Sequence, residues 1–546
     1  MFGLITDALC RAAERTPAAP ALVHRHRVWR YDDLWRASEA VARGLGDIGV
    51  TRGDRIAVYL PKSPEAVATM AGIWRAGAVA VPVNPLLKPH QVGHILRDCG
   101  VRVLVSSAGR RGSLGPVLGQ CPDLAVTVWL ADGSITAKSS ALPPQVAALD
   151  WEAWVAEGRG AGRGISIDVD VAAILYTSGS TGPPKGVVLS HRNLVAGAAA
   201  VAQYLALEPQ DRLLAVLPLS FDAGLSQLTT AFWVGARAVL LDYLLPREVV
   251  ETAAREGVTG ITAVPPLWMQ LAPLAWPAKA LESVRFIANT GGHLPRPVVA
   301  QLRRALPRAR VFLMYGLTEA FRSTYLPPEE LDRRPDSMGR AIPGAEVLVV
   351  RPDGGLCEVD EPGELVHRGA TVALGYWNDP ARTRERFRPA HGVAEELPLG
   401  EFAVWSGDTV RRDAEGYLYF IGRGDDMIKT SGYRVSPTEV EAIAHGSGLV
   451  AAAAAVGVPH PQLGQAIVLL VVPVGGVDEK AFDPEALGEH CRRQLPSYMV
   501  PSHIIPRREL PHTPNGKGDR RRLAEEWGGH FVQREPLPSK PSRSTP

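Results

Sequence analysis

A loop of small and hydroxyl-bearing residues lies about a third of the way along the chain, and its composition suits the binding of phosphate groups. Residues 176–186 read Tyr-Thr-Ser-Gly-Ser-Thr-Gly-Pro-Pro-Lys-Gly. Glycines let backbone N–H groups turn toward one anion, the hydroxyls are further donors, and Lys185 adds a positive charge. The Walker loop ends in Gly-Lys-Ser or Gly-Lys-Thr, whereas Lys185 lies between Pro184 and Gly186. The stretch therefore predicts a phosphate-binding loop of another kind.

Two further motifs carry groups that a nucleotide needs. Residues 315–319 read Tyr-Gly-Leu-Thr-Glu and follow a short apolar run. The tyrosine can stack on a base, the threonine can hydrogen-bond a phosphate oxygen, and the glutamate can bind Mg²⁺. Residues 406–408 read Ser-Gly-Asp, and the carboxylate of Asp408 can accept hydrogen bonds from both ribose hydroxyls. We expect these side chains to meet around one nucleotide.

Two motifs toward the C-terminal end are charged and contain glycine. Residues 422–435 read Gly-Arg-Gly-Asp-Asp-Met-Ile-Lys-Thr-Ser-Gly-Tyr-Arg-Val, which has the character of a charged break between domains. Residues 513–517 read Thr-Pro-Asn-Gly-Lys. A lysine in such a loop is normally solvated, but its ammonium can also stabilise negative charge that develops in a transition state.

Taken in this order, the motifs resemble those of the AMP-forming adenylating enzymes, from about residue 4 to residue 525. That superfamily includes acyl-CoA synthetases, adenylation domains of nonribosomal peptide synthesis and beetle luciferases. The resemblance implies ATP-dependent activation of a carboxylic acid as acyl-AMP, with release of pyrophosphate, followed by transfer to a thiol. It also implies ATP and Mg²⁺ as cofactors, and CoA or a phosphopantetheinyl carrier protein as the thiol acceptor.

The resemblance assigns roles residue by residue. It implies that Lys517, Thr318 and Glu319 act at the reacting centre, and that Glu319 also binds the metal. The implied ATP-binding residues are Thr177, Ser178, Gly179, Ser180, Thr181, Gly182, Lys185, Gly291, Gly292, Tyr315, Gly316, Asp408 and Arg423. In the charged break, Asp425 would be the hinge about which the C-terminal domain rotates, and Gly432 would lie near the thiol tunnel.

The stretch 218–224, Pro-Leu-Ser-Phe-Asp-Ala-Gly, bears on which acid is activated. Acyl-CoA synthetases of fatty or aromatic acids commonly have a histidine where Phe221 stands. The stretch resembles instead the amino-acid-activating adenylation domains, whose aspartate at the position of Asp222 pairs with the substrate's amino group. Asp222 can also cap the helix that follows, because aspartate favours N-cap positions. We favour the amino-group role.

The same alignment predicts the lining of the acid pocket. The predicted lining residues are Phe221, Asp222, Ala223, Ser226, Asn289, Met314, Arg322 and Ser323. Arg322 is unusual in an apolar pocket, and three roles stay open for it: pairing with a second carboxylate of the substrate, extending to the surface, or bracing Glu319.

Two readings of the reaction follow. In the favoured one, the enzyme loads an amino acid or amino-bearing acid onto a carrier protein; in the alternative, it is an acyl-CoA synthetase that uses a non-amino acid. Residues 221–227 and 315–340 also resemble a subgroup, the AMP-forming acyl-CoA ligases of exosortase-A systems. A nucleotide-binding protein without turnover is disfavoured because Glu319, Asp408 and Lys517 are all present. The motifs alone leave a luciferase-like monooxygenase open.

Composition bounds the class of protein. At 546 residues the chain exceeds what one core usually supports, so two or more domains are expected. A formal net charge of +2 argues against a nucleic-acid surface, and no apolar run is long enough for a membrane span. The five cysteines lack zinc spacing, and an odd, scattered set of this kind suits a cytoplasmic protein.

The elements that must position these motifs are expected to alternate between strand and helix. Strand-like runs include 55–60, 79–83, 212–216, 260–264 and 311–315. This alternation predicts an α/β fold with a large N-terminal layered domain, 1–422, built on parallel sheets with a small β portion. Residues 423–526 are expected to form a small mobile α+β domain, and residues 527–546 a disordered tail.

Overall fold

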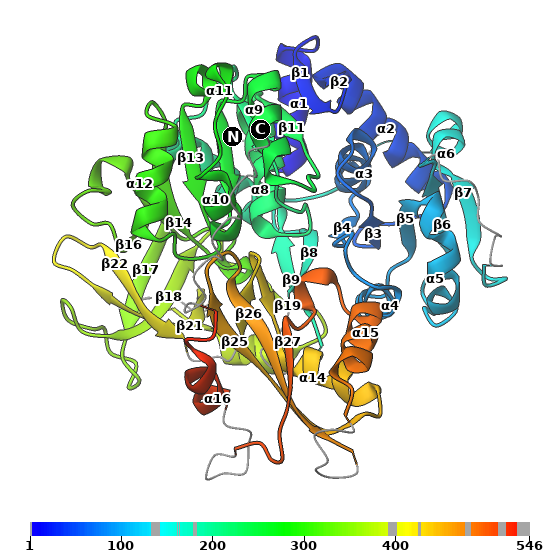
Figure 1. Cartoon of the computed structure of the whole chain (residues 1–546). Coiled ribbons are helices and arrows are strands. Elements are labelled where there is room, and N and C mark those ends of the chain that lie inside the picture. Colours follow the sequence, from blue (N-terminus) through cyan, green and yellow to red (C-terminus); the bar gives the residue numbers. More distant parts are fainter. Residues whose placement is uncertain are drawn as a thin grey trace, which may run out of the picture. The chain divides into compact units, whose positions relative to one another are not determined.

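The computed structural model describes residues 3–132, 142–160, 162, 164–177, 183–390, 401–423, 427–474, 482–511 and 520–531. These residues form two compact units. The first unit comprises the described residues before 178 together with 184–423, and the second comprises Pro183 and the described residues after 426. The mixed α/β architecture predicted from the sequence is confirmed (Figure 1).

One sheet of the first unit carries the phosphate-loop motif. Its strand order is β19-β9-β8-β4-β3-β5-β6-β7. The strands are β3 (Arg55–Tyr59), β4 (Val79–Pro82), β5 (Val103–Ser107), β6 (Val126–Leu130), β7 (Ala147–Asp150), β8 (Val171–Thr177), β9 (Lys185–Ser190) and β19 (Gly375–Tyr376). The run from β8 to β7 is parallel, and β4 and β5 are wholly buried, as parallel strands between helices are. The helices of this region are α2 (Tyr31–Asp47), α3 (Pro64–Arg75), α4 (Pro89–Asp98) and α5 (Arg111–Leu118).

A second sheet carries the residues expected to bind the base and the acid. Strands β10 (Arg212–Ala215), β11 (Arg237–Leu240), β12 (Gly260–Ala263), β13 (Phe286–Asn289) and β14 (Arg310–Tyr315) are parallel in the order β11-β10-β12-β13-β14. Helices α9 (Pro246–Glu256), α10 (Pro265–Leu271) and α12 (Arg296–Ala305) lie alongside these strands (Figure 1). They contribute apolar side chains to the core against the strands. The carboxyl ends of the strands therefore share one edge, where ligands of such sheets bind.

Two strand pairings in the structure do not follow the order of the strands along the chain. Strand β8 pairs with β4 and with β9, so the phosphate-loop hairpin belongs to the sheet of the first 150 residues rather than to the series that follows it. Strand β1 (Pro20–His24), with its hairpin partner β2 (Arg27–Arg30), extends the second sheet beside β11. Periodicity identifies a strand but not its partner, because pairing depends on register and on non-local packing.

The small antiparallel β portion is continuous with the second sheet. From β14 the sheet runs through β15 (Thr324–Leu326) and β16 (Ser337–Ala341) to β22 (Leu418–Arg423), β21 (Phe402–Arg412), β18 (Gly363–Gly369) and β17 (Ala345–Val350). These pairings are antiparallel, as expected from the turn-rich sequence. The path brings Asp408, on β21, into the same sheet as Tyr315, on β14.

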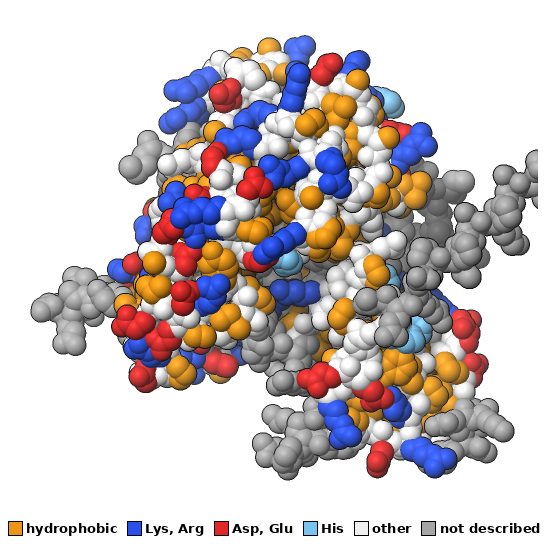
Figure 2. Space-filling model, turned by 60° about the vertical axis from the view of Figure 1, so that its left-hand side comes forward, with side chains coloured by type: hydrophobic (Ala, Val, Ile, Leu, Met, Phe, Trp, Pro, Cys, Tyr) orange, Lys and Arg blue, Asp and Glu red, His pale blue; other side chains and the backbone are white. Residues whose placement is uncertain are grey.

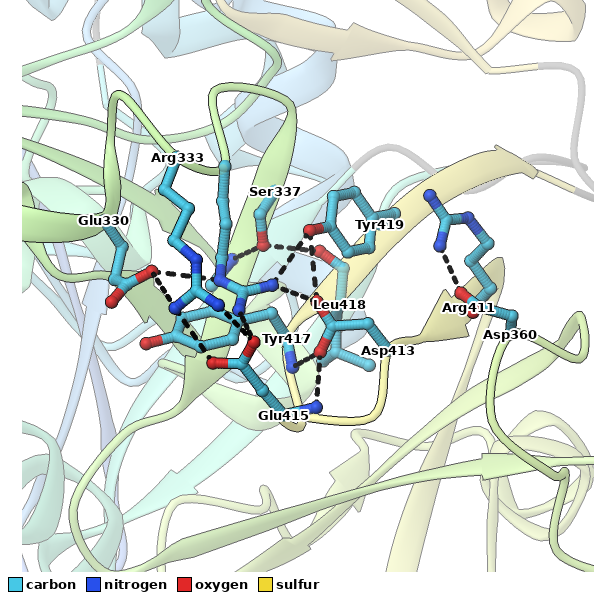
Figure 3. Close-up of polar contacts among 12 residues, drawn as sticks. Glu330, Arg333, Ser337, Asp360, Arg411, Asp413, Glu415, Tyr417, Leu418 and Tyr419 are labelled. Atoms are coloured by element: carbon cyan, nitrogen blue, oxygen red, sulfur yellow. Dashed lines mark hydrogen bonds and ion pairs between the residues drawn. The ribbon is translucent and has the colours of Figure 1, made fainter.

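An ionic cluster fixes the turn between β21 and β22 (Figure 3). Buried Arg334 forms ion pairs with Asp413, with Glu415 and, at 3.0 Å, with Glu330. Its guanidinium also lies 4.2 Å from the centre of the Tyr417 ring. Arg333 makes two hydrogen bonds to Glu415, of 2.6 and 3.0 Å. Several charges sharing partners hold a geometry better than an isolated surface pair does.

The second unit is a small α+β body. Strands β23 (Ile428–Thr430), β24 (Tyr433–Val435), β25 (Val450–His460), β26 (Gly464–Pro473) and β27 (His503–Pro506) form its sheet. Helices α14 (Pro437–Gly446) and α15 (Pro484–Gln494) contribute to the core on one side, and α16 (Arg520–Trp527) contributes to a smaller core on the other. Packing extends to Phe531, five residues beyond the boundary expected from composition.

The described surface mixes both charge signs. On the face drawn in Figure 2, Lys and Arg side chains are interspersed with Asp and Glu, in keeping with the formal net charge of +2. None of the helices in the described ranges combines the length and apolarity that crossing a bilayer requires.

Candidate active site

Three side chains from separate segments meet beside the phosphate-loop hairpin. Lys185 begins β9, and Tyr376, on β19, pairs with the same strand. The Lys185 ammonium donates a 2.6 Å hydrogen bond to the Tyr376 hydroxyl, which donates a 2.7 Å hydrogen bond to Oε1 of Glu319. Lys185 Nζ lies 3.3 Å from the same carboxylate oxygen and 3.9 Å from the centre of the Tyr376 ring. The predicted phosphate and metal residues are therefore adjacent.

Sequence reasoning missed Tyr376. The only local signal is a Gly-Tyr-Trp-Asn run, which by itself indicates a turn. Its importance becomes visible only through the antiparallel pairing of β19 with β9, which places the tyrosine opposite Val187. Such pairing depends on two segments separated by about 190 residues and has no local sequence signature.

The predicted base and ribose residues also meet. The Tyr315 hydroxyl donates a short hydrogen bond to Oδ2 of Asp408, and the two residues come from strands β14 and β21. Asp408 is buried, and its backbone N–H donates to the Ser406 hydroxyl at 3.1 Å. Ser406 in turn donates to the Leu365 carbonyl at 2.7 Å. The carboxylate is thus held in place before any ligand arrives.

Gly407 is required between these two residues. Its φ of 73° lies in the left-handed region, and a Cβ there would lie 2.5 Å from Nη1 of Arg386. Its N–H donates to Glu364 Oε1 at 2.9 Å. Only glycine accepts this backbone conformation without strain, and it lets the strand turn Asp408 toward Tyr315.

His367 lies behind the tyrosine. Its ring stacks on Tyr315 with centroids 6.0 Å apart and an interplanar angle of 17°. Neither ring nitrogen has a hydrogen-bond partner among the described residues, and burial lowers the pKa of the imidazole to about 3. A neutral imidazole is therefore a flat, uncharged support for the Tyr315 ring at neutral pH.

The remaining predicted nucleotide residues follow β13 and β14. Asn289 ends β13, and its amide donates to the Gly292 carbonyl at 2.8 Å, which fixes the turn at Gly291. Thr318 begins the 3₁₀ turn Thr318–Ala320, two residues after Gly316. These segments lie at the carboxyl edge of the parallel strands.

A cavity lies against one face of these parallel strands, with an empty volume of about 380 Å³ that includes open solvent. Four of the eight predicted acid-pocket residues line it: Ala223, Ser226, Met314 and Arg322. The rest of the lining is Val201, Tyr204, Leu205, Leu207, Leu213, Gln227, Thr230, Gly260, Thr262 and Phe286. The other four predicted residues, Phe221, Asp222, Asn289 and Ser323, are close in the chain to the lining but do not form it.

Asp222 lies in the first turn of helix α8 (Asp222–Val234), with Phe221 at the N-cap position. Its Oδ1 accepts the Ala223 N–H at 2.7 Å, but Asp222 is the first residue of the helix rather than its N-cap, so the capping role considered from the sequence is not present. Its Oδ2 lies 3.5 Å from Nη1 of Arg322. The carboxylate thus accepts a backbone N–H of the first helical turn and faces a buried cation at once.

Arg322 does not extend to the surface, because only 5% of its side chain is exposed. Its ion-pair partner within the described ranges is Asp222 rather than Glu319. Two of the three roles left open from the sequence are therefore wrong, and pairing with a substrate group remains.

Several predicted site residues lie outside the described residues. These are Ser178, Gly179, Ser180, Thr181, Gly182, Asp425 and Lys517, together with the side chain of Arg423. Thr177 ends β8, opposite Lys185. In the second unit, Gly432 has φ 82° in the turn that joins β23 to β24.

The chain is similar to known proteins over most of its length. The profile of AMP-binding enzymes matches residues 9–377, and that of the AMP-binding enzyme C-terminal domain matches residues 439–517. An L-proline–[L-prolyl-carrier protein] ligase of Pseudomonas fluorescens is 30% identical over 96% of this chain and 100% of its own length. A long-chain-fatty-acid–CoA ligase of Yersinia pestis is 29% identical over 94% of this chain and 93% of its own. The solved o-succinylbenzoate CoA synthetase of Bacillus subtilis has a TM-score of 0.80 and 26% identity over 95% of this chain and 98% of its own.

Proposed function

The chain belongs to the AMP-binding enzyme family, and we propose that it loads an amino-bearing carboxylic acid onto the thiol of a carrier protein. It is an AMP-forming acid–thiol ligase, which activates a carboxylic acid with ATP as acyl-AMP and transfers the acyl group to a thiol. The choice of acid and of thiol acceptor is the proposed part.

One observation carries the assignment of the site. Met314 lines the cavity, and Tyr315, the next residue of β14, hydrogen-bonds Asp408. Successive residues of a strand point to opposite faces, so the end of β14 lies between the cavity and the pair of residues that we propose bind the nucleotide. An acid in the cavity and a nucleotide at Tyr315 would then share one edge, which is where a carboxylate must meet the α-phosphorus of ATP.

The chain's own groups supply positioning and charge. Tyr315 would stack on the base, and Asp408 would accept the ribose hydroxyls. Lys185 would neutralise the β- and γ-phosphates that leave as pyrophosphate when the acid's oxygen bonds to the α-phosphorus. No protein nucleophile is needed, so catalysis rests on orientation and preorganised electrostatics.

The donor set at Glu319 fits Mg²⁺. The buried Glu319 presents a carboxylate oxygen beside Lys185, and Mg²⁺ is usually held by one or two carboxylates together with substrate phosphates. When bound, the ion neutralises phosphate charge. Tyr376 would orient the Glu319 carboxylate through its hydrogen bond.

The charged break and the loop around Lys517 complete the proposal by resemblance. We assign residues 1–422 to the nucleotide-binding domain and 423–526 to the mobile domain, with Asp425 as hinge and Gly432 beside the thiol path. Lys517 would stabilise charge at the α-phosphate during adenylation. The five cysteines form no disulfide, which supports a cytoplasmic enzyme that meets a thiol acceptor there.

The amino-bearing substrate is supported by Asp222, and one relative's name specifies proline and a carrier protein. The alternative, a non-amino acid transferred to CoA, is supported by a relative named for fatty acids and by the positive charge that Arg322 already places near Asp222. In the first reading the negative charge of Asp222 binds the substrate's amino group, whereas in the alternative it only balances the charge of Arg322.

Asp222→Asn separates them. Asparagine can still accept the Ala223 N–H at the helix start, but it cannot pair with an ammonium as an anion. We expect ATP–pyrophosphate exchange with the preferred amino acid to fall about 100-fold or more, in keeping with loss of a buried charged contact. Equal exchange by both proteins, with a non-amino acid as the better substrate, would instead favour the acyl-CoA synthetase.

A further inference from the structure

Arg322 is a buried cation with unused hydrogen-bonding capacity. Among the described residues its guanidinium forms no hydrogen bond, and its ion pair with Asp222 is 3.5 Å long. Charge-assisted N–H···O bonds are normally about 2.7–2.9 Å long, and a guanidinium has five N–H donors. Arg322 also lines the cavity, so a ligand there can reach it.

A second polar group in the lining also has hydrogen-bonding capacity that no described residue uses. The Thr230 hydroxyl is buried and forms no hydrogen bond in the described part of the chain. Thr230 lies one helical turn beyond Ser226 on α8, so both belong to the helix face that lines the cavity. By contrast, the side-chain amide of Gln227 already donates hydrogen bonds to the carbonyls of Leu214 and Thr262. The cavity thus combines apolar walls with a cation and a hydroxyl that a ligand can use.

The backbone is strained at Phe321, the residue immediately before Arg322. Phe321 has φ 53° and ψ −48°, a conformation that bulky residues rarely adopt. Its ring is fully buried, and it fills the space left by Gly197, where a Cβ would lie only 2.4 Å from the ring. Packing of the Phe321 ring holds this turn. Strain of this kind persists where the surrounding structure fixes it, and it occurs often at ligand sites.

The charges of Asp222 and Arg322 determine which charged group a ligand of the cavity must carry. An ammonium bound to Asp222 would compete with Arg322 for the one anion that pairs with it among the described residues, and would leave a buried guanidinium uncompensated. The one carboxylate of a plain fatty or aromatic acid must face ATP, so it would not be free to pair with the guanidinium. A ligand that carries a second anion satisfies Arg322 in either case.

We propose that the acid activated by this enzyme carries a second carboxylate, held by Arg322 inside the cavity, in addition to the one that reacts with ATP. This inference rests on the proposed function and names its substrate class: a dicarboxylic acid, with an amino group in the favoured reading. Arg322 is then the residue that selects the substrate.

The test compares acids matched in chain length that differ only in the second carboxylate. The pairs are glutamate and norvaline, aspartate and 2-aminobutyrate, glutarate and pentanoate, and succinate and butanoate. ATP–pyrophosphate exchange is measured with wild type, Arg322→Met and Arg322→Lys. We expect wild type to favour a diacid over its partner by about 100-fold or more in kcat/KM, because a site built for a polar group rejects the analogue that lacks it.

Arg322→Met should bring this ratio close to one, and Arg322→Lys should restore part of it, because lysine keeps the charge but lacks the planar fork. Should the methionine variant not fold, Arg322→Lys and the isosteric Thr230→Val carry the comparison, each with a reduced ratio. A wild-type ratio near or below one, or a ratio that no variant changes, overturns the inference while leaving acid activation intact.

Binding separates this inference from the proposed function. The thermal shift caused by each acid is measured without ATP. Absence of exchange, with a shift by diacids that Arg322→Met abolishes, supports the second-carboxylate site and overturns the proposed activity. Absence of both exchange and a diacid-specific shift overturns both.

Discussion

The hydroxyl of Tyr376 lies 2.7 Å from Oε1 of Glu319, to which it donates a hydrogen bond. The same hydroxyl accepts a hydrogen bond from Lys185. This hydroxyl bridges the lysine of the phosphate-loop hairpin and the proposed metal-binding carboxylate, which also form a direct ion pair of 3.3 Å. Tyr376 is therefore placed to set the geometry of both groups when a nucleotide binds.

Tyr376→Phe tests this arrangement. Phenylalanine keeps the ring beneath Lys185 but removes the hydroxyl that links the two charged residues. Loss of hydrogen bonds to charged groups costs about 1.5–3 kcal/mol, so we expect kcat/KM for ATP to fall about 10- to 100-fold. Pyrophosphate exchange at varied ATP measures this. Tyr376→Leu should fall further, because it also removes the ring; wild-type behaviour of the phenylalanine variant would mean that Lys185 and Glu319 do not depend on the hydroxyl.

Lys517→Ala tests the division between the two half-reactions. Removal of a transition-state contact typically costs about 3–4 kcal/mol, so formation of acyl-AMP should drop about 100- to 1,000-fold. Thioester formation from acyl-AMP supplied directly should stay within a few-fold of wild type. Equal losses in both steps would contradict the proposed role of this lysine.

Gly197→Ala tests the packing that supports Arg322. The new Cβ would lie 2.4 Å from Cδ1 of Phe321, whose ring is fully buried. Overpacking of this kind costs about 1–3 kcal/mol, so the denaturant midpoint should fall. Gly112→Ala is the matched control in helix α5, because a Cβ there meets nothing within 4 Å; it should leave stability equal or slightly higher. A similar midpoint for both variants would show that the Phe321 ring can move aside.

Stability should depend on pH through His367. Burial lowers the pKa of this imidazole from 6.5 to about 3, so between these values the unfolded chain binds a proton that the folded chain does not. The contribution is complete above pH 6.5 and is lost as the pH falls. Between pH 7.5 and 5.5 the loss is about 1.4 kcal/mol. His367→Leu should therefore lose about that much less than wild type over this interval, measured by denaturant unfolding. An unchanged difference between the two proteins would show that His367 titrates normally in the fold.

Much of the secondary structure follows from local sequence patterns and could be predicted from them. The parallel strands of the second sheet are short apolar runs between helices, and runs such as 212–216 and 260–264 match β10 and β12 to within one residue. The pairing of β8 with β4 was not predictable, because it joins segments about 90 residues apart without a local signal.

The residues of the candidate site were likewise predictable only where they lie in local sequence motifs. Motif residues such as Tyr315, Asp408 and Lys185 were identified because each is a side chain of suitable chemistry in a glycine-containing turn, and the structure brings Tyr315 to Asp408. Tyr376 and His367 were missed, since each acts through a strand pairing or a stacking contact that sequence spacing does not encode. The pairing of Asp222 with Arg322 was missed for the same reason, because the two residues lie 100 positions apart.

The central claim is that this protein activates a carboxylic acid with ATP, and acid-dependent exchange of labelled pyrophosphate into ATP tests it most directly. The panel contains amino acids, dicarboxylic acids and simple monocarboxylic acids, each with Mg²⁺, with Glu319→Gln as the control variant. We predict exchange only in the presence of an acid, highest with an amino dicarboxylic acid, and strongly reduced in the variant. Exchange with none of the acids, or ATP cleavage to ADP regardless of the acid present, would contradict the account.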